Sequence, residues 1–171
     1  MHNAAFQHMG LKFHYMSFEI APENLVTVLK GLRWIAHGLN VTIPFKTAVL
    51  GLVDELSEEA EKTGAVNTIV MQNGRMKGYN TDVVGVLQPF RRRGISLLGA
   101  QALVIGAGGA SRACIVALNR LGCSDFMVLN RSRGRFEELK AYLETRLGVD
   151  LSWYPLDMEF LSSFARMSDV I

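Results

Sequence analysis

The sequence predicts an α/β fold with mostly parallel strands, and three observations support this class. Short β-rich runs alternate with segments whose apolar residues recur at helical spacing. Residues 102–105 are all apolar, as in a parallel strand that is buried on both faces. A glycine-rich loop follows this run directly and leads into a helical pattern. The 49% hydrophobic and 20% charged content agrees with a globular chain that can bury a core.

The first half of the chain is predicted to combine short strands with several helical pieces. The predicted elements are a strand at 13–18, a helix that starts near Pro22, continues to Ala36 and ends at Gly38, a short strand at 39–43, helical pieces at 47–54 and 58–63, and a helix at 82–93. Asn73-Gly74 is a strong turn signal between two β-rich runs, 66–71 and 75–79, so these runs are predicted to form a hairpin.

The second half is predicted to begin near Leu98 and to alternate strands with helices. The predicted elements are strands at 102–105 and 126–129, a helix after the glycine loop, a helix whose apolar residues are Phe136, Leu139, Leu143 and Leu147, a strand at 151–156, and the opening of a fourth strand at 168–171. Gly148 is expected to close the second helix. A domain boundary is predicted at 94–99, which divides the chain into residues 1–96 and 97–171.

Charge and composition exclude several classes of partner. The net charge of +2 is too small to argue for nucleic acid or a membrane surface. The two cysteines and four histidines show no metal-ligand spacing, so no metal is expected. The longest apolar stretch, 97–110, is too short and too rich in glycine to cross a bilayer. Met1 is not followed by a charged and then apolar leader, so a cytoplasmic protein is expected.

The glycine loop has the spacing of a dinucleotide site. Residues 106–111 follow the pattern G-x-G-x-x-S, where Gly or Ala is more usual at the last place. Gly106 can make the tight turn, and Gly108 lets the backbone approach a pyrophosphate. The helix that follows offers free N–H groups and the positive end of its dipole. The alternative is a plain turn between a strand and a helix.

The end of the next predicted strand indicates which dinucleotide is bound. Asn130 stands where an acidic residue would bind the ribose hydroxyl of NAD. Arg131, Ser132, Arg133 and Arg135 follow it, and arginine matches phosphate oxygens in charge and geometry. NADP is therefore the predicted cofactor. The alternative is a solvated basic helix start, although arginine in a first helical turn opposes the dipole unless an anion binds there.

Polar residues in the first half are candidates for a catalytic site. Lys46 and Thr42 lie at a strand end, where open α/β sheets bind ligands. Taken alone, Lys46 also fits a surface lysine, and Asp82 or Thr81 also fits the cap of the following helix. Asn67 lies early in a strand, where its amide could bind substrate hydroxyls or close a turn.

The order of the motifs resembles the shikimate dehydrogenase family. The motifs are Asn-Val-Thr-Ile-Pro-Phe-Lys at 40–46, Gly-Ala-Val-Asn-Thr at 64–68, Tyr-Asn-Thr-Asp at 79–82, Gly-Ala-Gly-Gly-Ala at 106–110 and Asn-Arg-Ser at 130–132. The resemblance covers essentially the whole chain. It implies an N-terminal α/β substrate domain and the first part of a Rossmann-type NADP-binding domain, with the active site in the cleft between them.

The resemblance also implies roles for individual residues. Lys46 would be the catalytic acid and base, paired with Asp82. The residues that would bind the substrate, shikimate or 3-dehydroshikimate, are Thr42, Asn67 and Asp82. Those that would bind NADP are Gly106, Ala107, Gly108, Gly109, Ala110, Asn130, Arg131, Ser132 and Arg135. Two alternatives stay open: a quinate/shikimate dehydrogenase of the same fold that uses NAD, and a non-catalytic nucleotide-binding module.

The chain departs from the family pattern at both ends. The family's first strand and its Ser-x-Ser-Pro motif do not precede Met1, and the rest of the nucleotide sheet does not follow Ile171. We therefore expect a fragment with weak or no activity of its own. Open sheet edges favour self-association, which makes a homodimer possible.

Overall fold

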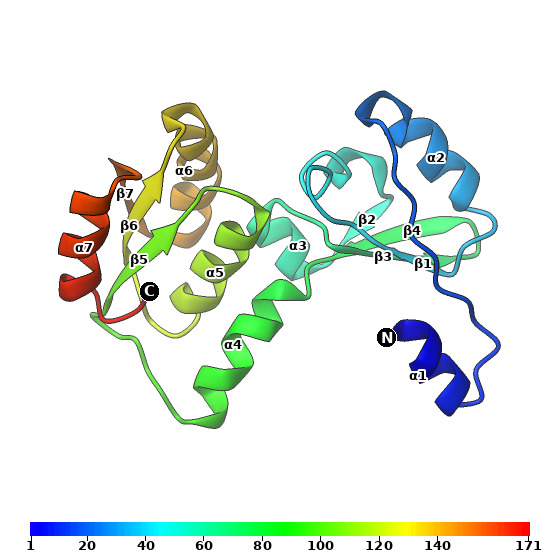
Figure 1. Cartoon of the computed structure of the whole chain (residues 1–171), viewed down its shortest axis with the longest axis horizontal. Helices are drawn as coiled ribbons and strands as arrows, with labels where there is room; N and C mark the ends of the chain where they lie inside the picture. The colour runs from blue at the N-terminus through cyan, green and yellow to red at the C-terminus, as the bar shows by residue number, and fades with distance from the viewer.

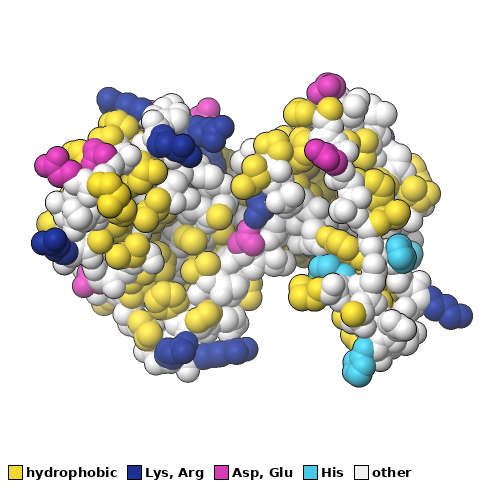
Figure 2. Space-filling model, in the orientation of Figure 1, with side chains coloured by type: hydrophobic (Ala, Val, Ile, Leu, Met, Phe, Trp, Pro, Cys, Tyr) yellow, Lys and Arg dark blue, Asp and Glu magenta, His cyan; other side chains and the backbone are white.

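The structure is a computed structural model that describes all residues from Met1 to Ile171. Two sheets form the two halves of the molecule, and helix α4 (Asp82–Arg92) leads from the first half to the second and lies beside α5 (Figure 1). The space-filling view shows a deep indentation between the halves on the same face (Figure 2). The α/β class predicted from the sequence is confirmed, although the predicted mostly parallel pairing holds in the second sheet and not in the first, where β3 pairs antiparallel with both of its neighbours.

The first sheet has four strands in the order β1-β3-β4-β2. These strands are β1 (Gly38–Asn40), β2 (Glu55–Leu56), β3 (Thr68–Gln72) and β4 (Arg75–Tyr79). The predicted hairpin joins β3 and β4 in antiparallel register, and it turns at Asn73 and Gly74, with φ of 52° and 73°. Both angles are the positive values that a two-residue hairpin turn requires. β2 was not predicted, because two residues are too short to show a pattern.

One face of this sheet is covered by short helical elements: η1 (Pro22–Asn24), α2 (Leu25–Leu32), η2 (Leu50–Leu52) and α3 (Glu58–Thr63). The predicted continuation of α2 to Ala36 is wrong. The chain turns after Leu32, and Trp34 then lies against the hairpin turn, so closely that a Cβ at Gly74 would be 2.4 Å from Trp34 Cζ3. The piece predicted at 47–54 is reduced to turns and η2.

The strand predicted at 13–18 is absent, and helix α1 (His2–His8) precedes that segment instead. The side chain of Asn3 takes the place of a neighbouring strand. Its Oδ1 accepts from the Tyr15 N–H at 2.6 Å, and its Nδ2 donates to the Tyr15 carbonyl at 2.9 Å. The apolar residues that suggested a strand make tertiary contacts instead: Phe13 packs on Phe6 and His37.

The second sheet is fully parallel, with the order β5-β6-β7. Its strands are β5 (Gln101–Ile105), β6 (Asp125–Asn130) and β7 (Asp150–Pro155). Helices α5 (Gly109–Asn119) and α6 (Arg133–Leu147) cover one face, and α7 (Met158–Met167) covers the other (Figure 1). Helix α7 was not predicted. Where a fourth strand was expected to open, Val170 forms a parallel bridge with Ala102 beside β5.

The core of the second sheet extends beyond its own helices. Val83 and Leu87 of α4 are buried in the same apolar cluster as Phe126 and Leu139. Helix α4 therefore belongs to the core of the second half and packs against α5, although it precedes the predicted boundary. The division into residues 1–96 and 97–171 stays a prediction.

Candidate active site

Lys46 and Asp82 meet although 36 positions separate them in the chain. Lys46 Nζ donates to Asp82 Oδ2 at 2.6 Å, and the two side chains are only 19% and 35% exposed. Asp82 is the first residue of α4, where the helix dipole favours a carboxylate. Lys46 lies in the turn that follows β1, and its carbonyl accepts from the Val66 N–H at 2.7 Å. The lysine is therefore a partly buried, paired group rather than a free surface residue.

Asn67 holds the same carboxylate from a second direction. Its Nδ2 donates to Asp82 Oδ1 and to Thr81 Oγ1, both at 2.9 Å, and its Oδ1 accepts from the Thr81 N–H at 3.0 Å. Asn67 is 8% exposed, so these bonds form away from water. The side chain of Thr81 makes no capping bond to α4. Thr81 thus stands at the N-cap position of α4, but neither it nor Asp82, whose carboxylate binds Lys46 and Asn67, forms the side-chain cap that was the alternative.

Asn80 also supports the pair, and sequence reasoning gave it no role. Asn80 is 2% exposed, and its Oδ1 accepts from the Asp82 N–H at 3.1 Å. Its Nδ2 donates to Thr63 Oγ1 at 3.1 Å and to the Ala65 carbonyl at 2.9 Å. An asparagine two residues before the start of a helix is typical of an Asx turn, which is the signal that could have identified it.

Thr42 is not brought into this network. It is exposed, and its side chain makes no hydrogen bond to the chain, while its carbonyl accepts from the Phe45 N–H at 2.9 Å. Its hydroxyl group is therefore free to bind a ligand.

The glycine loop lies directly beside Lys46. Gly106 has a φ of 101°, which favours glycine, and its N–H donates to the Leu129 carbonyl at 2.8 Å. Gly108 stands at the N-cap position before α5 and has no side chain to cap it, so the first N–H groups of the helix are free. A Cβ at Gly109 would lie 3.2 Å from Lys46 Cδ. The loop, with Ala107 and Ala110, therefore places unpaired N–H groups of the kind that bind anions beside the stem of Lys46.

The basic segment after β6 lies at the same edge of the sheet as the loop, because β5 and β6 are parallel neighbours. Asn130 Nδ2 donates to the Ser132 carbonyl at 2.7 Å, and Ser132 Oγ accepts from the Arg135 N–H at 3.4 Å. Arg131 and Arg135 are exposed and form no ion pair in the structure. The first turn of α6 contains no acidic residue. These residues fit an anionic group such as the phosphate of NADP.

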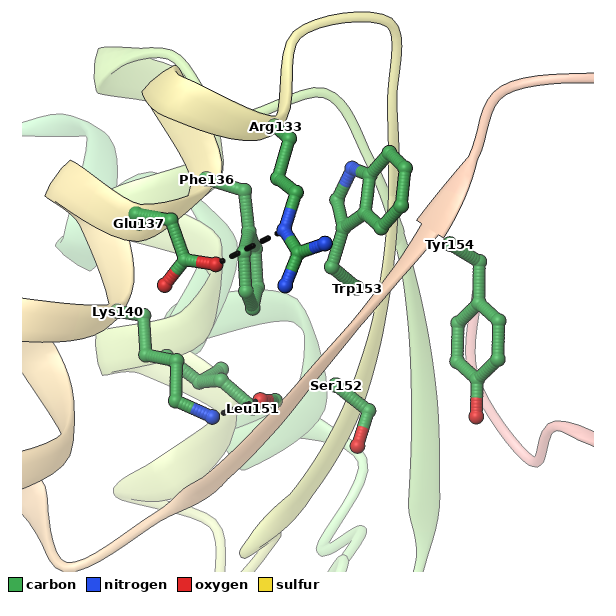
Figure 3. A pocket seen from close by; sticks show the side chains of 8 residues that line it. All are labelled: Arg133, Phe136, Glu137, Lys140, Leu151, Ser152, Trp153 and Tyr154. Atoms are coloured by element: carbon green, nitrogen blue, oxygen red, sulfur yellow. Dashed lines mark hydrogen bonds and ion pairs between the residues drawn. The ribbon is translucent and has the colours of Figure 1, made fainter.

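A separate groove of about 460 Å³ lies between α6 and the edge strand β7. Figure 3 shows Arg133 and Trp153 facing each other in it, while Tyr154 points to the other side of the strand. Its cations are already neutralised, since Arg133 pairs with Glu137 at 3.3 Å and Lys140 pairs with Glu144 at 3.2 Å. Of the residues that the sequence offered for phosphate binding, this groove contains only Arg133.

Cys114 of α5 lies near the carboxylate of Asp82. Burial, together with the negative charge of Asp82, raises the pKa of the Cys114 thiol. Because the thiolate is the nucleophile, we expect iodoacetamide to alkylate Cys114 several-fold more slowly than free cysteine near pH 8. The variant Asp82→Asn should speed the reaction, as measured by mass spectrometry. Alkylation at the rate of free cysteine would contradict this prediction.

The structure contains no group of three or more His, Cys, Asp or Glu side chains that could hold a metal ion. None of its helices combines the length and apolar character that crossing a bilayer requires.

A parallel sheet whose glycine loop opens a helix beside a lysine–carboxylate pair defines an α/β protein of the dinucleotide-binding class. Residues 1–69 match the family of shikimate dehydrogenase substrate binding domains, and residues 91–161 match the shikimate / quinate 5-dehydrogenase family. The chain belongs to the shikimate dehydrogenase family.

Individual relatives agree with this assignment. The shikimate dehydrogenase (NADP(+)) of Citrifermentans bemidjiense is 42% identical over 96% of this chain and 59% of its own length. The shikimate 5-dehydrogenase of Listeria monocytogenes, solved with shikimate and NAD, has a TM-score of 0.80 at 30% identity, over 98% of this chain and 60% of that protein. The shikimate 5-dehydrogenase of Thermus thermophilus, solved with NADP(H) and shikimate, has a TM-score of 0.73 at 37% identity. The match covers 88% of this chain and 56% of that protein. The chain thus spans about 60% of the length of such relatives.

Proposed function

We propose that this chain carries the catalytic pair and the adenosine half of the cofactor site of an NADP-dependent shikimate dehydrogenase. The reaction is the reversible reduction of 3-dehydroshikimate to shikimate, a step in the biosynthesis of aromatic amino acids. One observation carries the proposal: Lys46 Nζ lies 2.6 Å from Asp82 Oδ2, while the Lys46 stem packs against Gly109 of the glycine loop. Proton transfer and nucleotide binding would thus meet at one place.

The chemistry requires a proton donor beside the reacting oxygen. When bound, NADPH supplies a hydride to the ring ketone. The ketone oxygen gains negative charge, which the Lys46 ammonium stabilises before it delivers a proton. In the reverse direction the neutral amine of Lys46 accepts the hydroxyl proton. Asp82 directs the amine through their hydrogen bond, and Asn67 fixes the orientation of Asp82.

The substrate would lie against Lys46, with Thr42, Asn67 and Asp82 around its hydroxyl groups. The hydroxyl of Thr42 is unoccupied by protein partners, whereas both N–H groups of Asn67 are already used. Thr42 would therefore bind the substrate without rearrangement. Asn67 would have to exchange one of its bonds, or would act on the substrate through Asp82.

The cofactor would be held by two neighbouring loops. The N–H groups at the start of α5, exposed by the glycines at 106, 108 and 109, would bind the pyrophosphate. Arg131 and Arg135 would bind the phosphate of the adenosine, with Asn130 and Ser132 shaping the loop through their own hydrogen bonds.

The direct test follows the absorbance of the reduced cofactor with shikimate and either NADP or NAD. It is run on this chain and on a version extended to the length of its relatives. Turnover of shikimate with NADP by the longer version, and weak or no turnover by this chain, is the expected result. Turnover of quinate with NAD would favour the quinate/shikimate alternative. Absence of both turnover and nucleotide binding in the longer version would refute the proposal.

Replacement of Arg135 by alanine should weaken NADPH binding while leaving NADH binding unchanged. The expected loss is about 10- to 100-fold, which corresponds to one charge-assisted bond to phosphate. Arg146→Ala is the control, because Arg146 is an exposed arginine of the same helix but lies in its last turn, away from the basic segment at the start of α6. Fluorescence titration of both nucleotides measures the effect. Equal losses for NADPH and NADH in Arg135→Ala would contradict the assignment.

Three expectations about the surroundings of the protein stay predictions. They are a cytoplasmic location, the lack of nucleic acid and membrane partners, and a possible homodimer through open sheet edges. Light scattering at several protein concentrations would test the last of these.

A further inference from the structure

Arg112 of α5 is a buried cation without a carboxylate partner. It is 8% exposed, and its Nη1 and Nη2 donate to the carbonyls of Thr63 and Glu138 at 3.3 and 3.5 Å. Its guanidinium lies 5.1 Å from the centroid of the Tyr142 ring. Burial lowers its pKa, since water no longer stabilises the charge. Burying a charge costs free energy, so its place in the structure calls for a physical reason.

The group that Arg112 reaches is the C-terminal end of helix α3. The last carbonyls of a helix lack intrahelical partners and form the negative end of its dipole. Arg112 binds the Thr63 carbonyl, and Tyr142 Oη donates to the Glu61 carbonyl at 2.7 Å. Gly64 closes the helix with a φ of +60°, and a Cβ there would lie 2.6 Å from Tyr142 Cζ. Helices α5 and α6 thus hold the end of α3, which lies between the two sheets (Figure 1).

The chain that follows α3 leads directly to the lysine–carboxylate pair. Thr63 Oγ1 accepts from Asn80 Nδ2 at 3.1 Å, and Asn80 Oδ1 accepts from the Asp82 N–H at 3.1 Å. Two residues after Gly64, the Val66 N–H donates to the carbonyl of Lys46 at 2.7 Å. Residues 63–66 therefore hold the backbone of Lys46 and, through Asn80, that of Asp82.

We propose that Arg112 is a positioning residue for the Lys46–Asp82 pair. It fixes the end of α3, and thereby the segment that holds both partners, relative to the glycine loop. Arg112 lies three residues after Gly109, against which the Lys46 stem packs. Helix α5 therefore determines the position of the glycine loop and, through Arg112, that of the Lys46–Asp82 pair. The assignment of a catalytic role to this pair rests on the proposed function, but the contacts of Arg112 do not.

The test compares Arg112→Met with the parent chain by two measurements that need no turnover. We expect the Val66 amide to exchange its hydrogen about tenfold faster, because the segment opens more often. We also expect Lys46 to be acetylated several-fold faster by an amine-reactive ester, as measured by mass spectrometry. Amides of β6 serve as an internal standard, since a general loss of stability would speed their exchange equally.

Arg146→Met is the matched control. Its guanidinium lies 3.9 Å from the same Tyr142 ring centroid, but the residue is exposed and donates only to the Tyr142 carbonyl. It should leave the exchange rate of the Val66 amide and the acetylation rate of Lys46 as in the parent. The proposal would be overturned if a folded Arg112→Met kept both parental rates, or if Arg146→Met changed them as much as Arg112→Met does.

Should Arg112→Met fail to fold, Arg112→Lys decides the question. Lysine keeps the charge but cannot bridge two carbonyls in a fixed geometry. Faster hydrogen exchange of the Val66 amide in this variant supports the proposal. Parental rates of both Val66 exchange and Lys46 acetylation overturn it. Neither measurement depends on turnover, so absence of the dehydrogenase reaction in the longer protein would refute the proposed function but not the positioning role of Arg112.

Discussion

Replacement of Lys46 by methionine is expected to lower shikimate turnover with NADP by about 10²- to 10⁴-fold, the usual contribution of a positioned acid and base. Methionine keeps most of the apolar stem against Gly109 but removes the only cation that touches Asp82. The loss should appear in kcat, with nucleotide affinity changed little. Initial rates in the version extended to the length of its relatives measure it.

Lys62→Met is the control for this substitution. Lys62 also pairs with a carboxylate, Glu58, at 2.7 Å, but both side chains are exposed on α3. Exposed pairs of this kind contribute little, so turnover should stay within about twofold of the parent. Turnover by Lys46→Met equal to that of Lys62→Met would remove the central residue of the proposed mechanism.

Replacement of Gly64 by alanine is expected to destabilise the chain by roughly 2–4 kcal/mol, from left-handed strain and overpacking together. The φ of +60° disfavours any residue with a Cβ. The added methyl group would also lie 2.6 Å from the Tyr142 ring and 3.0 Å from Arg112 Nη1, neither of which can retreat without losing its bond to α3. Urea unfolding followed by circular dichroism measures the change.

Gly148→Ala separates the two causes. Gly148 closes α6 with a φ of +63°, but a Cβ there would meet nothing within 4 Å. This variant should cost only about 1 kcal/mol, the strain of the left-handed conformation. If both alanine variants were equally destabilised, the close contact between α3 and Tyr142 would have no energetic importance.

Sequence patterns predicted the elements whose cause is local. The hairpin at Asn73-Gly74, the glycine loop with its helix and the left-handed end of α6 at Gly148 all depend on residues within a few positions of one another. Such features follow from backbone geometry and short hydrogen bonds. The same holds for α3, whose Ser57 cap accepts from the Ala60 N–H at 3.2 Å.

Predictions failed where distant parts of the chain compete for the same segment. Apolar composition suggested a strand at 13–18, but the Asn3 side chain occupies the N–H and carbonyl of Tyr15 that a strand would share with its neighbour. Helix α2 ends early as the chain turns Trp34 onto the hairpin. Helix α7 is an exception, because it was missed although its signal is local: Asp157 caps it by accepting from the Phe160 N–H at 2.9 Å.

The sequence by itself determined the α/β class, the order of the motifs and the residue types that suit a phosphate or a proton, because these depend on neighbours in the chain. The tertiary structure alone decided that Lys46 and Asp82 touch, that Asn67 and Asn80 hold the carboxylate, and that Thr42 stays free. Arg112 reads as an ordinary helical arginine in the sequence. Its contact with Thr63, 49 positions away, exists only because packing of α3 on α5 and α6 excludes water and brings the two groups within bonding distance.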